Sequence, residues 1–109
     1  MRIKMLLAAL VMLGSSSLAM AADYYVDITN RTGYTIMYMY VSPGDSQNWE
    51  DDVLGSDVLM DGVTQRVTLT GYNSPNFDIR LVDEDEDSYT FMNLDVSSED
   101  IVVTMDHLD

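Results

Sequence analysis

The sequence contains no cysteine, so the folded chain has neither disulfide bonds nor thiolate ligands for a metal. It has a single histidine, His107, and one histidine without cysteine cannot form a typical zinc site. Only five residues are basic, and two of them, Arg2 and Lys4, stand close to the N-terminus. A chain this poor in basic residues offers no basic face, which argues against binding to nucleic acid or to an anionic membrane surface.

The side chains of common catalytic motifs are missing as well. There is no glycine-rich phosphate loop, no serine in a nucleophile turn, and no lysine after Lys4. Nucleophilic, phosphoryl-transfer and redox chemistry therefore lack the groups that they need. We expect a protein that is not an enzyme and that holds no cofactor, apart from the calcium ion considered below.

The first 21 residues have the pattern of a secretory signal peptide. Two basic residues precede an apolar run over Met5–Leu13, and Ala19 and Ala21 supply small residues at the positions that a signal peptidase reads. The run is too short to cross a hydrocarbon core, which needs about 20 residues. We expect a signal peptide over 1–21, one domain over 22–109, export to the periplasm or the extracellular space, and no membrane contact after cleavage.

The remaining chain is strongly acidic. All 19 acidic residues follow the predicted signal peptide, and only Arg31, Arg66 and Arg80 oppose them there. An excess of this size favours solubility and opposes compaction through self-repulsion. It also favours cations or a basic protein as partners. The alternative is that the acidity serves solubility alone.

Beyond residue 21, apolar residues recur with a period of two, which is typical of strands and not of helices. Turn-forming pairs such as Pro43-Gly44 and Asp61-Gly62 separate the alternating runs. The pattern predicts an all-β domain, a small antiparallel β-sandwich of six to seven strands. The expected strands cover residues 24–29, 34–41, 57–60, 63–69, 77–81, 89–94 and 101–105.

One of these runs, YTIMYMYV at residues 34–41, is apolar on both faces. Strict alternation places Ile36 with the tyrosines on one face, and Met39 and Val41 on the other. A strand with two apolar faces predicts either a central position in its sheet or a second buried surface.

Three segments resemble a family of small exported bacterial β-domains: Asn30–Ser42 (NRTGYTIMYMYVS), Trp49–Gly55 (WEDDVLG) and Phe77–Leu81 (FDIRL). The family pattern has an N-x-T-G-Y-T-I strand, a W-x-D-D-L-L-G loop and an F-D-[IL]-R strand before an acidic hairpin. In this chain Glu50 stands where such loops often have glycine, and residues 83–87 lack the glycine expected inside that run. The resemblance implies a β-fold and export, and it implies no particular chemistry.

The acidic run DEDED at residues 83–87 places Asp83, Asp85 and Asp87 at alternating positions, as in calcium-binding loops. The rest of the helical calcium-loop pattern fails, because Ser88 replaces its glycine and Leu94 its bidentate glutamate. Two hypotheses follow: a Ca²⁺ site, or a hairpin turn whose carboxylates face water and discourage edge pairing. Replacing the three aspartates by asparagine is expected to raise stability without calcium, because like charges are removed.

A long irregular stretch contains the only tryptophan and several acids. Long loops in compact domains are often functional. Its candidate partner-binding residues are Trp49, Glu50, Asp51, Asp52 and Asp57. The ring of Trp49 could stack on a sugar or pack against the open end of the sandwich, and a lone loop aromatic favours packing.

Together these features predict an exported, acidic, non-enzymatic interaction module of the cell envelope. Its acidic loops would bind a basic protein or a divalent cation. The alternative is an inhibitor or immunity-like protein directed against a basic hydrolase. Such a protein would form a tight one-to-one complex that weakens steeply with salt.

Overall fold

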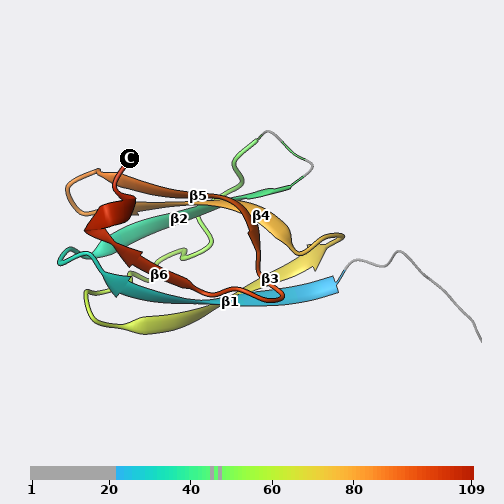
Figure 1. Ribbon diagram of the computed structural model, residues 1–109, viewed down its shortest axis with the longest axis horizontal. Coiled ribbons are helices and arrows are strands. Elements are labelled where there is room, and N and C mark those ends of the chain that lie inside the picture. The colour runs from blue at the N-terminus through green and yellow to red at the C-terminus, as the bar shows by residue number, and fades with distance from the viewer. Residues whose placement is uncertain (1–21, 45, 47) are drawn as a thin grey trace, which may run out of the picture.

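The computed structural model describes residues 22–44, 46 and 48–109, so the predicted signal peptide lies outside the described residues. Six strands form two three-stranded sheets, ordered β3-β1-β6 and β2-β4-β5, which face each other in Figure 1. This architecture confirms the predicted all-β sandwich. The elements are β1 Ala22–Arg31, β2 Ile36–Pro43, β3 Thr64–Tyr72, β4 Asn76–Asp83, β5 Ser88–Asp95, β6 Ile101–Thr104 and the 3₁₀ helix η1 Met105–His107.

The strands follow the alternation of the sequence, and β4 shows this most clearly. Phe77, Ile79 and Leu81 are fully buried between the sheets, whereas Asp78 and Arg80 point to the outer face. Burying a large apolar side chain stabilises the fold by about 1.5–3 kcal/mol. The buried rows of both sheets therefore supply the core of a domain that has no disulfide.

Strand β1 lies in the centre of its sheet. It pairs antiparallel with β3 and parallel with β6, where Ile28 stands opposite Ile101. The other sheet is wholly antiparallel, with β4 between β2 and β5. The parallel pair matters for function because it brings the first strand next to the turn that precedes the last strand.

Strand β2 differs from its predicted role in two ways. It is an edge strand and not a central one. A register shift between Ile36 and Tyr38 places Ile36 on the same buried side as Met39 and Val41. The tyrosine face is therefore not a second buried surface: Tyr38 is 45% exposed, and its ring stacks on that of Tyr40 with centroids 6.2 Å apart.

Two shorter segments complete the domain. The strand expected at 57–60 is reduced to one bridge between Leu59 and Ile36. The C-terminal segment forms η1, which is capped by a hydrogen bond from the Thr104 N–H to His107 Nδ1 (3.1 Å). The last residue returns to β5, since the Asp109 N–H donates to the carbonyl oxygen of Ser88 (2.9 Å).

Candidate functional site

The acidic hairpin loop, residues 83–87, connects β4 to β5, and its first carboxylate is buried. Asp83 is only 1% exposed. Its Oδ1 accepts hydrogen bonds from the backbone N–H groups of Asp85 (2.9 Å) and Asp87 (3.0 Å). Its Oδ2 accepts one from the hydroxyl of Tyr89 (2.7 Å), whose side chain is fully buried. Asp83 therefore fixes the backbone of the turn from inside.

This arrangement also affects Tyr89. Burial of the ring, together with the hydrogen bond to Asp83 and the negative charge there, raises the pKa of the Tyr89 hydroxyl above its ordinary value. Tyr89 is thus a neutral donor at physiological pH, as the carboxylate of Asp83 requires. The pair links the acidic hairpin loop to the core.

The other four acids of the loop are exposed to solvent. Glu84 accepts a hydrogen bond from the Thr35 N–H (2.9 Å), and Glu86 adopts the left-handed conformation, with φ of 67°. Of the predicted calcium ligands, Asp83 is turned inward while Asp85 and Asp87 face water. Within the part of the chain that the structure describes, no three or more Asp, Glu or His side chains converge as a metal site. Calcium binding stays a prediction.

The loop that follows β2 contains the predicted partner-binding residues, and two of its acids have structural contacts. The Oδ1 of Asp52 accepts hydrogen bonds from the Met39 N–H (2.9 Å) and the Leu54 N–H (3.0 Å). The Oε1 of Glu50 accepts one from the Tyr72 hydroxyl (2.5 Å). Burial, followed by this hydrogen bond and the charge of Glu50, raises the pKa of Tyr72 to about 12.

The remaining residues of that loop are presented to solvent. Asp51 and Asp57 are exposed. Trp49 is 37% exposed and lies outside the core, with the Arg80 guanidinium 4.8 Å from the centre of its ring. The expectation that Trp49 packs against the open end of the sandwich is wrong, because the ring lies against a cation on the outer face of β4.

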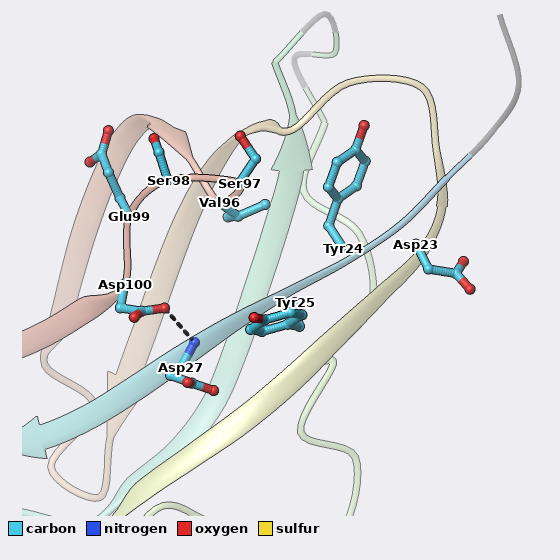
Figure 2. A pocket seen from close by; sticks show the side chains of 9 residues that line it. All are labelled: Asp23, Tyr24, Tyr25, Asp27, Val96, Ser97, Ser98, Glu99 and Asp100. Carbon is cyan, nitrogen blue, oxygen red and sulfur yellow. Dashed lines mark hydrogen bonds between the residues drawn. The ribbon is translucent and has the colours of Figure 1, made fainter.

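A third acidic region, which sequence reasoning missed, is the acidic pocket. Figure 2 shows it between the first half of β1 and the turn that joins β5 to β6. Its volume is about 290 Å³. Four carboxylates and two tyrosine rings contribute to its lining, which comprises Asp23, Tyr24, Tyr25, Asp27, Val96, Ser97, Ser98, Glu99 and Asp100.

One carboxylate of the acidic pocket is already neutralised. Asp27 forms a bidentate pair with Arg66, at 2.8 and 3.1 Å, and the hydrogen bond from Arg66 lowers the pKa of Asp27. The same guanidinium lies 3.9 Å from the centre of the Tyr25 ring. The negative charge that is left belongs to Asp23, Glu99 and Asp100.

Local hydrogen bonds fix the turn that forms one wall of the pocket and join it to β1. Asp95 accepts hydrogen bonds from the hydroxyl (2.5 Å) and the N–H (2.9 Å) of Ser97. Both bonds set the turn and lower the pKa of Asp95, the hydroxyl more than the N–H. Asp100 Oδ1 accepts from the Asp27 N–H (3.1 Å), as the dashed line in Figure 2 shows. The pocket is therefore part of the folded framework.

Sequence reasoning missed this pocket because its two walls are far apart in the chain. Only the parallel pairing of β1 with β6 brings residues 23–27 next to residues 96–100. The sequence holds only a weak indication of the pocket. Acidic residues lie near the starts of β1 and β6, and the turn Ser-Ser-Glu-Asp precedes β6.

No protein-family model, curated protein or solved structure matches the chain. Among the described residues, no helix has the length and apolar character needed to span a membrane.

Proposed function

We propose that this protein is an exported, non-enzymatic binding module of the cell envelope that docks a basic protein partner. The acidic pocket is the proposed contact point, and it holds a lysine or arginine side chain of the partner. The single observation that carries the proposal is the combination of a cavity of about 290 Å³ with carboxylates and tyrosine rings in its wall.

The chemistry of the lining fits a cationic side chain. Carboxylates accept charge-assisted hydrogen bonds from guanidinium and ammonium groups, and aromatic faces attract cations. Arg66 provides an internal example, because it is held by the carboxylate of Asp27 and the ring of Tyr25. Tyr24 stands between Glu99 at one end of the lining and Asp23 at the other (Figure 2), so a cation from outside meets an aromatic ring flanked by carboxylates, although Asp23 Oδ1 already accepts the Gly71 N–H (3.3 Å).

The overall charge supports the same kind of partner. Nineteen acids face three arginines in the domain, so long-range attraction speeds the approach of a basic protein and repels acidic ones. The acidic hairpin loop adds to this field, since Asp83 holds four exposed carboxylates in a fixed turn. Preorganised charges of this kind lower the cost of ordering on binding.

A peptide of six arginines serves as the probe for the test. We expect its affinity to fall with added monovalent salt, because exposed charge pairs are screened. The double variant Asp23→Asn with Glu99→Gln should weaken binding about tenfold, which corresponds to about 1.4 kcal/mol. The charge-matched control is Asp85→Asn with Asp87→Asn, which removes two exposed acids from the hairpin loop and should weaken binding less than about threefold.

The readout is isothermal titration calorimetry on both variants, after thermal melts show that each is folded. An equal loss of affinity in the two variants would show that only net charge matters and that the pocket is not the contact point. A larger loss in the control would move the contact to the acidic hairpin loop.

A further inference from the structure

The edge strands of the two sheets differ in how far other segments cover their outward backbone groups. Backbone hydrogen bonds from the 50–59 segment cover β2, for example the Val53 N–H to the Met39 oxygen (2.8 Å), and the last residues cover β5. Strand β6 has only four residues. Strand β3 has nine, and no described residue makes a backbone hydrogen bond to its outer edge. It is the long open edge of the described domain (Figure 1).

The register shows which backbone groups this edge presents. The Asp27 N–H donates to Asp100, on the side of β1 away from β3. Asp27 stands opposite Arg66, so their pair is a non-hydrogen-bonded one, and the N–H and C=O of Arg66 also point away from β1. The alternation of an antiparallel ladder gives Thr64 and Thr68 the same orientation. Three residues therefore present unpaired donors and acceptors on one side.

The composition of β3 leaves this edge without the usual protection. Natural edge strands are blocked by proline, lysine or inward-facing charges. Thr64–Tyr72 (TQRVTLTGY) contains no proline, no lysine and no acid, although the chain has 19 acids. Its one charge, Arg66, is paired with Asp27.

We propose that a second copy of this chain occupies the edge, with the two β3 strands antiparallel around a twofold axis. The two three-stranded sheets then join into one sheet of six strands. Such an interface is self-complementary, because each copy presents the same row of donors and acceptors to the other.

The local charge at this edge, that of Arg66, favours a second copy as the occupant and also favours one register. A strand from a basic protein would set its cations beside Arg66, whereas a second copy presents threonines. Pairing Arg66 with Thr68 of the second copy places Val67 opposite Val67 of that copy. This register avoids the direct Arg66–Arg66 pair, and like charges directly opposite are destabilising.

Salt should affect the proposed dimer and the proposed complex with a basic partner in opposite directions. Two acidic copies repel each other at long range, and monovalent salt screens this repulsion within about 10 Å at 0.1 M. Dimerisation should therefore strengthen with salt, while binding of a basic partner weakens. Each proposal can thus fail without the other.

The first test is sedimentation equilibrium of the purified protein at low and high salt. We expect a dimer at high salt. Thr68→Pro removes one outward N–H and leaves the β1 ladder intact, since edge strands tolerate proline at such positions. It should raise the dimer dissociation constant at least tenfold, whereas the matched variant Thr68→Ala, which keeps the N–H, should remain dimeric. A monomer at high salt, or a dimer that Thr68→Pro leaves intact while folded, overturns the proposal.

A second test covers the case in which Thr68→Pro fails to fold. The chain has no cysteine, so a single engineered cysteine reports its own contact. Val67→Cys should form a covalent dimer under mild oxidation at high salt, because the two residues face each other across the twofold axis. Gln65→Cys, on the same side of the strand but opposite Leu69 of the second copy, is the control. Equal cross-linking of both, or none of Val67→Cys, contradicts the proposed pairing.

Discussion

Replacing Asp83 by asparagine should destabilise the domain, even though it removes a charge from the most acidic part of the chain. The carboxylate is 1% exposed and accepts three hydrogen bonds, from the N–H groups of Asp85 and Asp87 and from the hydroxyl of Tyr89. From the sequence alone, the opposite sign is expected, because an acid within a run of acids suggests repulsion. Burial reverses that expectation at this position.

The magnitude follows from the three bonds. A hydrogen bond to a charged acceptor contributes about 1.5–3 kcal/mol and a neutral one about 1 kcal/mol. In the variant, the amide oxygen still accepts the two N–H groups, now as a neutral acceptor. The amide nitrogen faces the Tyr89 hydroxyl, which must rotate to accept. A loss of about 1 kcal/mol for each of the three weakened bonds, offset by up to about 0.5 kcal/mol of relieved repulsion, leaves about 2.5 kcal/mol.

Urea and thermal denaturation of the purified domain measure this change. For a domain of this size, about 2.5 kcal/mol lowers the melting temperature by about 10–20 °C. Asp85→Asn and Asp87→Asn are the controls: both side chains are exposed, and the free energy of unfolding should change by less than about 0.5 kcal/mol in either. A variant Asp83→Asn that melts at or above these controls would refute the assignment of Asp83 as an internal support of the turn.

Three further predictions concern the same region and the tyrosines. Glu86→Gly should raise the free energy of unfolding by about 1 kcal/mol in a urea melt, because φ is 67° there, while Asp85→Gly should give no gain. The raised pKa values of Tyr72, about 12, and of Tyr89 contribute stability that is present below about pH 10 and is lost as pH rises further. An absorbance titration should show tyrosines that ionise above pH 10, and one of them should be missing in each of the variants Tyr72→Phe and Tyr89→Phe. If the melting temperature falls above pH 10 but no tyrosine ionises late, the raised pKa values are not the cause. If the hairpin loop binds calcium, CaCl₂ should raise the melting temperature more than NaCl at equal ionic strength, and equal shifts would assign the effect to screening alone.

The strands could be predicted from the sequence because alternation reports directly on a half-buried strand. Phe77, Ile79 and Leu81 are a clear case, and β4 has the predicted orientation. The same rule failed at β2, where the register shift after Ile36 moves the alternation by one residue. A bulge of this kind depends on the partner strand, so the run YTIMYMYV alone does not contain it.

The candidate site was less predictable, because it depends on contacts between distant segments. The inward orientation of Asp83 requires the hydroxyl of Tyr89 on the next strand, and nothing in the run DEDED distinguishes its first acid from the others. The acidic pocket requires a parallel pair between β1 and β6, a choice that alternation does not specify. Loop composition did identify Trp49 as unusual, but its contact with Arg80 depends on where the loop lies over β4.

The parallel pair also has a consequence for how the chain reaches its native state. The first described strand, β1, occupies the middle of its sheet, and one of its two neighbours, β6, is the last described strand. Contacts between segments this distant close large loops and are slow to form. This sheet is incomplete until β6 is present, so β1 waits for a strand that follows it by about 70 residues. If the protein is exported, as the sequence predicts, this late closure would keep the chain unfolded for passage through a translocation channel.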